Sequence, residues 1–146
     1  MRISAKTRYA LRILLDIAYH GKNDPRTIRS IAASQEISEK FASPLVVTLR
    51  RAGLLKSLRG VNGGLLLAKP PEFISLLDVV NAMDGEIFLL DCLKASNACP
   101  RKGRCMTARF WNDINETIRD KFRSITLKAI LDQYISGKLN EETYSI

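Results

Sequence analysis

The chain has 146 residues, of which 46% are hydrophobic and 26% charged, so it fits one globular domain, or a small domain with an oligomerisation arm. Its 23 Lys and Arg residues outnumber its 15 Asp and Glu residues, and the resulting charge of +8 favours a nucleic acid, an anionic membrane or an acidic partner. No apolar run approaches the roughly 20 residues that cross a bilayer, and the N-terminus does not resemble a signal peptide, so we expect a cytoplasmic protein.

The first predicted element is an amphipathic helix that Ser4 can cap and Gly21 ends. Apolar residues recur there at positions i, i+3, i+4, i+7 and i+8, namely Ala10, Ile13, Leu14, Ile17 and Ala18. The one histidine, His20, falls at the end of this helix, where an exposed side chain is a simpler expectation than a ligand.

Two short helices follow a turn at Asp24-Pro25. Thr27 can cap the first, and Ser38 can cap the second, which ends at Gly53. Two short helices joined by a tight turn describe a helix-turn-helix, whose second helix is the candidate reader of the major groove. A helical hairpin that binds no DNA is the alternative.

Residues 54–68 contain two strand-like runs separated by a tip rich in Gly and Asn. Asn62-Gly63 predicts a hairpin, because both residues accept a positive φ. A hairpin after a helix-turn-helix is a wing, and Arg59 at its tip can enter the minor groove. The alternative for Arg59 is a solvated side chain in a flexible turn.

The candidate DNA contacts lie on the second helix and the wing. Ser38, Lys40 and Ser43 are expected on the groove side, Thr48, Arg50 and Arg51 near phosphates or solvent, and Arg59 and Asn62 on the wing. Pro44 predicts either a kinked helix, or a helix that begins with Ser43 as its cap and Pro44 as its first residue.

The C-terminal part is predicted to be helical. Ser75 and Asp78 form a capping-box pattern for a helix that ends at Gly85. After Cys105, apolar residues recur every fourth position and predict a long helix, while its opposite side carries Asn115, Glu116, Arg119, Asp120 and Arg123. We interpret this helix as an antiparallel dimer arm, with packing on its own domain as the alternative. Residues 124–126 interrupt it, a short helix follows through Tyr134, and the tail 136–146 is expected to be loose.

All three cysteines, Cys92, Cys99 and Cys105, lie in one loop with the spacing C-x6-C-x5-C. Such thiols could converge on a metal or an iron-sulfur cluster, or two of them could form a disulfide. In the reducing cytoplasm expected for this chain thiols stay reduced, which favours the metal or the cluster over the disulfide. Neighbouring basic residues would favour thiolate over thiol: Lys94, Arg101, Lys102 and Arg104.

Several stretches together resemble the Rrf2 family of winged-helix transcription regulators, most closely its iron-sulfur regulators. They are RYALRILLDIA, SLRGVNGG with LLLAKP behind it, the three-cysteine loop, CMTARFWNDI and SITL, and the resemblance covers residues 1 to about 134. It implies a homodimer that binds a palindromic DNA operator, with an iron-sulfur cluster, favoured as [2Fe-2S], held by Cys92, Cys99 and Cys105. Genes of iron-sulfur assembly would be the targets.

Two positions depart from that pattern. The histidine that completes the cluster in the iron-sulfur regulators is replaced by Ala108, and the aspartate that a nitric-oxide-sensing branch takes from the partner subunit is replaced by Arg8. The fourth ligand is therefore unassigned, and Asp16, Glu86, Asp91, a water or a small thiol are candidates. Where the iron-sulfur regulators carry an acidic and an amide base reader, this chain has Ser43 and Pro44, so its base preference should differ.

The fold class predicted from these features is mainly α with a small β-hairpin wing. Its parts are a winged helix-turn-helix domain (1–85), a cysteine loop (86–105), a dimerisation helix with a closing helix (106–135) and the tail (136–146). The expected function is a DNA-binding transcription regulator controlled by a cluster. Alternatives are a nitric-oxide or redox sensor of the same family, a cluster-free repressor like its cysteine-metabolism regulators, and a zinc-stabilised DNA-binding domain. An electron-transfer or redox enzyme is a further alternative, but it would need a substrate cleft or a fourth protein thiolate. Neither is visible in the sequence and no catalytic motif is found, so an enzyme is not expected.

Overall fold

The computed structural model describes residues 2–95 and 99–144, with the backbone alone for 138–144. The chain is mainly helical with one two-stranded antiparallel hairpin, so the predicted fold class is confirmed. In chain order the elements are α1 (Ala5–His20), α2 (Ile28–Ser34), α3 (Glu39–Arg51), β1 (Leu55–Leu58), β2 (Gly64–Leu67), η1 (Pro71–Phe73), α4 (Leu76–Met83), η2 (Asp91–Leu93), α5 (Ala108–Ser124) and α6 (Leu127–Tyr144). Within the described ranges, no helix is both long and apolar enough to span a bilayer.

Short-range capping residues begin the helices where the sequence predicts. The side chains of Ser4, Thr27 and Ser38 each accept a hydrogen bond from the backbone N–H three residues later. Ser75 and Asp78 form the reciprocal capping box of α4. Interactions between residues close in sequence therefore determine where α1 to α4 begin.

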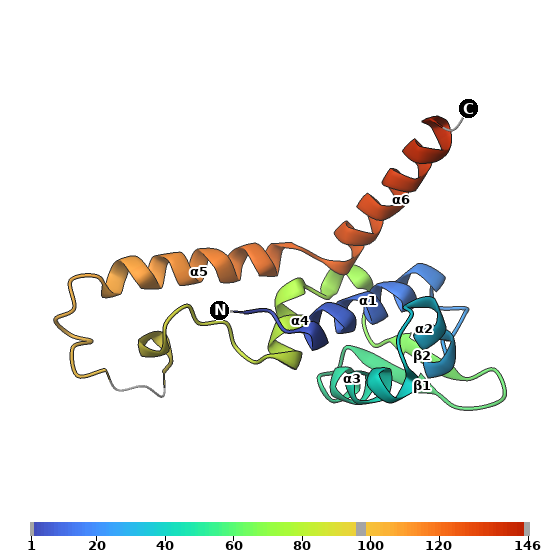
Figure 1. Ribbon diagram of the computed structural model, residues 1–146, viewed down its shortest axis with the longest axis horizontal. Coiled ribbons are helices and arrows are strands. Elements are labelled where there is room, and N and C mark those ends of the chain that lie inside the picture. Colours follow the sequence, from blue (N-terminus) through green and yellow to red (C-terminus); the bar gives the residue numbers. More distant parts are fainter. Residues whose placement is uncertain (1, 96–98, 145–146) are drawn as a thin grey trace.

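Helix α1 is the centre of the hydrophobic core (Figure 1). Its residues Ile13, Leu14 and Ile17 are 0–1% exposed. Helices α2, α3, α4 and α6 and strand β2 all pack against it. The predicted helix-turn-helix, the hairpin and the C-terminal elements therefore share one core.

The wing is the β1–β2 hairpin, with Leu55 paired to Leu67 and Leu58 paired to Gly64. The predicted turn chemistry is wrong, because neither Asn62 nor Gly63 adopts a positive φ. Five residues separate the strands, and Gly60 (φ +117°) makes the reversal instead. A Cβ at Gly63 would clash with the carbonyl oxygen of Leu58, so this position is restricted to glycine by close backbone approach.

The break between α5 and α6 is fixed by backbone pairing to the start of α4. The N–H of Leu76 donates to the carbonyl of Ile125 (2.8 Å), and the N–H of Leu127 donates to the carbonyl of Ile74 (2.9 Å). The Leu127 side chain is fully buried in the main core. The predicted interruption at 124–126 is therefore an anchored corner of the fold.

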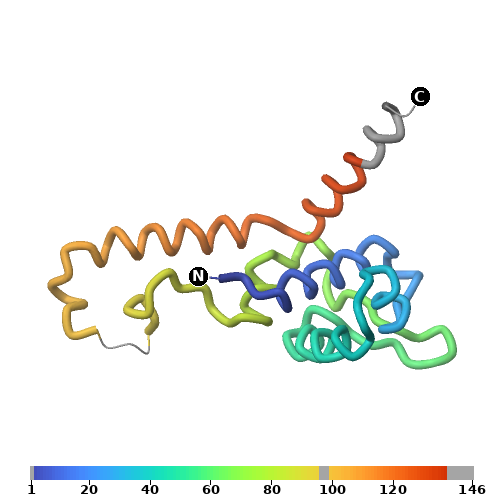
Figure 2. Tube along the Cα trace, in the orientation of Figure 1, coloured from blue at the N-terminus to red at the C-terminus, as the bar shows by residue number. Residues whose placement is uncertain are grey.

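Helix α5 packs on its own domain along only part of its length. Figure 2 follows the chain out from α4 to the cysteine loop and back along α5, whose amino-terminal half projects from the domain. Near its other end, Ile118 and Phe122 pack against a small core made by Leu77, Val80 and Ile87. The alternative of own-domain packing therefore holds for the carboxyl-terminal half of α5, while the antiparallel dimer arm stays a prediction for the projecting half.

Two predictions for the C-terminal region are wrong. Asn115, expected on the solvent side, is 1% exposed, and its Oδ1 accepts a hydrogen bond from the backbone N–H of Leu89 (2.9 Å). The tail expected to be loose from 136 is helical as far as Tyr144, while 145–146 lie outside the described residues. Its Lys, Leu and Glu residues favour a helix without forming an apolar stripe, which is why periodicity does not detect it.

The corner at Leu127 makes a testable prediction. Leu127→Ala should lower the free energy of unfolding by about 2–5 kcal/mol, because it opens a cavity in the core. Urea denaturation measures this loss. The neighbouring exposed Lys128 provides the control, since Lys128→Ala removes only a surface ion pair with Asp132 and should cost less than about 1 kcal/mol. Equal losses in the two variants would contradict the anchoring role of Leu127.

Candidate nucleic-acid interface and cysteine loop

Helices α2 and α3 form the predicted helix-turn-helix. The turn between them passes through Glu36, whose φ of +55° places it in the left-handed region, and Ile37, which packs against the main core. Helix α3 runs without interruption through Pro44 and is capped by Ser38. The alternative in which Ser43 caps a shorter helix is therefore wrong.

The predicted DNA-contact residues lie at the exposed parts of α3 and the wing. Ser38, Lys40, Arg50 and Arg51 are exposed at the two ends of α3, whereas Ser43 and Thr48 are half-buried in its middle. Arg59 and Asn62 are exposed in the wing tip.

A shallow hollow between the end of α3 and β1 adds Lys56 as a candidate contact residue, which the sequence-based set omits. Arg50, Arg51 and Lys56 line it together with Val47. Three cations around one hollow can neutralise a phosphate, so the surface suits a polyanion. Lys56 belongs to this surface because β1 returns alongside the last turn of α3, a contact that sequence spacing alone does not reveal.

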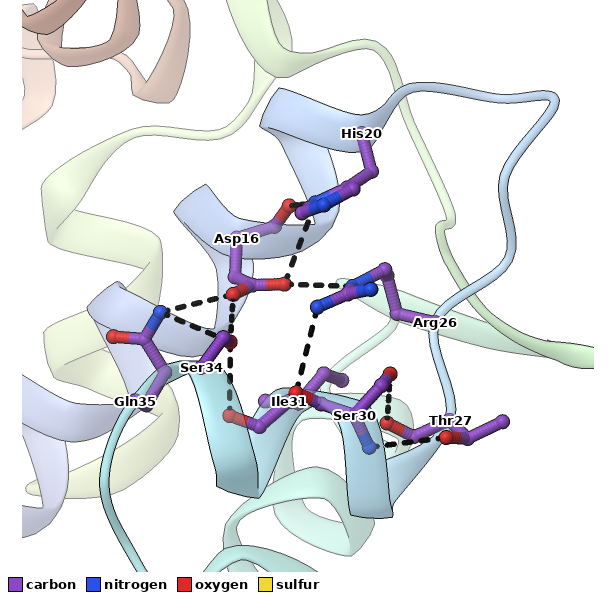
Figure 3. A network of polar contacts seen from close by, with 8 residues as sticks. All are labelled: Asp16, His20, Arg26, Thr27, Ser30, Ile31, Ser34 and Gln35. Carbon is purple, nitrogen blue, oxygen red and sulfur yellow. Dashed lines mark hydrogen bonds and ion pairs between the residues drawn. The ribbon is translucent and has the colours of Figure 1, made fainter.

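A buried carboxylate joins α1 to the helix-turn-helix (Figure 3). Asp16, on α1, accepts hydrogen bonds from Arg26 Nε (2.9 Å), Gln35 Nε2 (2.9 Å) and the hydroxyl of Ser34. Ser34 and Gln35 lie at the end of α2, next to the turn before α3. The network therefore sets the position of the reader's turn against the central helix.

Arg26 extends this network to the wing. Its guanidinium binds Asp16, while its backbone N–H and C=O pair with Leu65 of β2 at 3.0 and 2.7 Å. A Cβ at Gly64 would lie 2.9 Å from the Arg26 carbonyl oxygen, so the close approach of the two segments depends on glycine there. One residue thus connects α1, the wing and the chain entering α2. The sequence carries no sign of this, because Asp16 and Arg26 meet only after folding.

The pKa of the Asp16 carboxyl lies below its ordinary value. Burial raises this pKa, but the hydrogen bonds from Ser34, Gln35 and Arg26 and the charge of Arg26 together outweigh burial. Asp16 is therefore ionised at neutral pH, and its oxygens are engaged within the domain. This excludes it as the fourth ligand of a cluster in this conformation.

The cysteine loop holds the three thiols at separate points. Cys92 lies in η2, where Lys94 Nζ binds Asp91 Oδ1 (2.6 Å), Cys99 is half-buried in a turn, and Cys105 stands just before α5. All three are free thiols, so the disulfide alternative is not present in this structure. Cys92 and Cys105 are exposed.

The environment of Cys105 favours its thiolate. Thr107 Oγ1 lies 3.4 Å from the sulfur and, with the backbone N–H of the same residue, lowers the pKa of the thiol. Burial opposes this, but less strongly than the two Thr107 interactions, and the backbone N–H of Ala108 and the charge of Arg101 lower the pKa by still smaller amounts. Thiolates are the donors that iron-sulfur clusters and zinc require.

The donor chemistry of this loop fits a thiolate-bound metal or cluster, but its conformation does not assemble the site. In the part of the chain that the structure describes, no three Cys, His, Asp or Glu side chains are gathered closely enough to hold a metal ion. Cluster binding would have to draw the three sulfurs together. Ala108, the first residue of α5, has no side-chain donor atom, and Arg8, exposed on α1, carries a cationic guanidinium, so neither supplies a fourth ligand.

The cysteine loop and the wing lie at opposite ends of the longest axis of the molecule (Figure 1). Between them, the segment before the loop is tied to α5 by Asn115, and α4 packs on both α5 and α1. The end of α4 is joined to the start of α1 through Asp84, which accepts hydrogen bonds from the Thr7 hydroxyl (2.7 Å) and the Ser4 N–H (3.0 Å). A continuous packed route therefore connects the loop to the reader.

Comparison with known proteins finds a family model that matches most of the chain. Residues 3–133 match Rrf2, described as an iron-dependent transcriptional regulator. The protein rrf2 of Nitratidesulfovibrio vulgaris is 35% identical over 131 residues, which cover 90% of this chain and 87% of that protein. The transcriptional regulator IscR of Erwinia tasmaniensis is 34% identical over 132 residues, covering 90% and 79%.

Among solved structures, the global cysteine regulator CymR of Bacillus subtilis superimposes with a TM-score of 0.74 at 30% identity. The match covers 91% of this chain and 98% of that one. The relatives are transcriptional regulators, which confirms the expectation of a regulator rather than an enzyme.

The buried carboxylate predicts a specific response to acid. Asp16→Asn should destabilise the protein by roughly 3 kcal/mol at neutral pH, since it leaves Arg26 without its charged partner. Because the folded-state pKa of Asp16 lies below the ordinary value of 3.8, its stabilising contribution is present above that pH and is lost as the pH falls through the folded-state pKa. Urea unfolding at a series of pH values should therefore show the two proteins converging in acid.

The exposed Asp24 supplies the control, because Asp24→Asn should leave stability within about 0.5 kcal/mol of the unchanged protein. A constant gap between Asp16→Asn and the unchanged protein from pH 7 to pH 3 would contradict the assignment.

Proposed function

Because the chain belongs to the Rrf2 family of transcriptional regulators, we propose that it binds a DNA operator with an affinity that an iron-sulfur cluster controls. The proposed ligands are Cys92, Cys99 and Cys105, and [2Fe-2S] is the favoured type. The observation that carries this proposal is the set of three free thiols in one basic loop next to α5, of which Cys105 is favoured as thiolate. By resemblance, iron-sulfur assembly genes are the proposed targets, and the cytoplasm is the proposed location.

In the proposed complex, α3 lies in the major groove and the wing lies along the neighbouring minor groove. Ser38, Lys40 and Ser43 face the groove, and Thr48, Arg50 and Arg51 lie near phosphates. Arg59 and Asn62 contact DNA from the wing tip. The exposure of the cationic residues and the hollow shared by Arg50, Arg51 and Lys56 support this arrangement.

We propose that the functional unit is a homodimer joined through the projecting half of α5. Phe110 and Trp111 are 62% and 38% exposed there, and their rings contact each other edge to face. Exposed aromatic side chains on a projecting helix favour burial against a partner, and a second copy of the chain gives the closed symmetry that a palindromic operator needs. A dimer would also place two readers on successive turns of DNA.

The proposed switch uses the packed route from loop to reader. Gathering the three thiols around a cluster would fix the loop and the segment that Asn115 holds. Helix α4 and Asp84 would pass that change to the start of α1, and the Asp16 network would pass it to the reader. The cluster can change operator affinity only if it binds one of the two arrangements more tightly.

A cluster-free repressor is the second candidate. Two observations favour it: the described conformation does not gather the thiols, and CymR is a close structural neighbour. The unassigned fourth ligand leaves both candidates open, and Glu86, Asp91, a water and a small thiol remain the proposed choices. An exchangeable fourth position would also suit a sensor of nitric oxide or redox state.

The first candidate predicts iron in the isolated protein. Anaerobic purification should yield a coloured protein with iron, sulfide and a Mössbauer spectrum of a cluster. Cys92→Ala, Cys99→Ala and Cys105→Ala should each lose the colour, because a three-thiolate site cannot spare one ligand. Met106→Ala, which shortens a fully exposed side chain next to Cys105, should keep it. A colourless unchanged protein that still binds DNA would support the cluster-free repressor instead.

The dimer proposal makes a separate prediction. Trp111→Glu should produce a monomer in light-scattering chromatography and weaken operator binding at least tenfold. In a symmetric dimer the substitution would bury two negative charges in the contact, one from each subunit, and burying unpaired charges is strongly destabilising. Asn112→Glu adds the same charge one residue along, about 100° around the helix, and should leave a dimer. Dimers of unchanged stability in Trp111→Glu would exclude this face of α5.

A further inference from the structure

The middle of the reader helix has little capacity to donate hydrogen bonds to bases. Between Lys40 and Arg50 its polar side chains are Ser43 and Thr48. The Ser43 hydroxyl donates to the carbonyl of Glu39 (2.7 Å), and the Thr48 hydroxyl donates to the carbonyl of Pro44 (3.1 Å). A hydroxyl has one proton, so both donors are already used inside the helix.

What this part of α3 presents to the outside is apolar. Pro44 is exposed, and Val47, three residues later on the same face, is 41% exposed. Lys40 precedes Pro44 by four residues, and Arg51 follows Val47 by four. The face therefore has an apolar centre with one cation at each end.

The apolar feature that the major groove offers is the C5-methyl group of thymine. Cations at the ends of the face suit phosphates and guanine edges, whereas Pro44 and Val47 can make only apolar contacts. Given the proposed DNA-binding function, on which this step rests, we propose that Pro44 and Val47 read thymine methyl groups at the centre of each operator half-site. The recognised feature is a C5-methylated pyrimidine.

This proposal predicts that single methyl groups control affinity. Operators are first selected from random duplexes with the purified dimer, and each thymine is then replaced by uracil, which removes only the methyl group. Replacement at the thymines facing α3 should weaken binding by about fourfold per buried methyl group. Placing 5-methylcytosine where selection tolerates cytosine at those positions should strengthen binding by a similar factor.

Two variants assign the effect to the helix. Val47→Ala and Pro44→Ala shorten exposed side chains. In each variant, replacing thymine by uracil at the base pair that the substituted residue contacts should no longer weaken binding, so the affinity ratio should approach one. Val61→Ala at the wing tip, where the side chain is fully exposed, is the matched control and should leave the full penalty. Circular dichroism and the dimer mass show that the variants are folded.

The outcomes separate this inference from the proposed function. If selection enriches no duplex, the DNA-binding function is wrong and the inference falls with it. If a duplex is bound tightly but uracil weakens binding nowhere under α3, the function stands and the inference is wrong. A full uracil penalty in both Val47→Ala and Pro44→Ala would also overturn it, because the methyl groups would then be read by other residues.

Discussion

The arrangement of the reader depends on one buried carboxylate. Asp16 lies on α1, the central helix of the domain, and binds Arg26, Ser34 and Gln35 at once. Through these partners it fixes the helix-turn-helix and, by the backbone pairing of Arg26 with β2, the wing. Burying an ion pair carries a desolvation cost, and here the pair connects the helix-turn-helix to the wing through Arg26. DNA recognition by two separate elements depends on their relative orientation.

The proposed control acts on this assembly from a distance. The cysteine loop is at the far end of the molecule, so a cluster held there does not touch the reader of the same chain. Its influence would have to pass through packed elements with two arrangements, or through the partner subunit, where a change in the tilt of α5 alters the spacing of the two readers. Along the first route, the backbone pairing at Leu127 joins the α5–α6 corner to the capped start of α4.

The sequence predicts the features of this fold that depend on near neighbours, and misses those that depend on distant ones. The caps at Ser4 and Ser38 and the order of helices and wing follow from local patterns, and they are confirmed. The Asn62-Gly63 dipeptide predicts a turn at Asn62. The loop between the strands has five residues, however, and the chain reverses at Gly60 instead. The burial of Asn115 and the Asp16 network are set by contacts between segments far apart in sequence. The family resemblance identifies the cysteines as candidate ligands, but nothing in the sequence specifies the conformation of their loop.

If an iron-sulfur cluster controls the proposed dimer, the affinity for DNA must differ between the protein with its cluster and the protein without it. The most direct measurement is the dissociation constant of the selected operator, under anaerobic conditions at one salt concentration, for the protein with its cluster and after chelation. The account predicts a change within the range of about 5–150-fold that is typical of coupled sites. Cys99→Ala should then bind with the affinity of the chelated protein. Equal affinities with and without a fully loaded cluster would contradict the account, even if the protein binds its operator tightly.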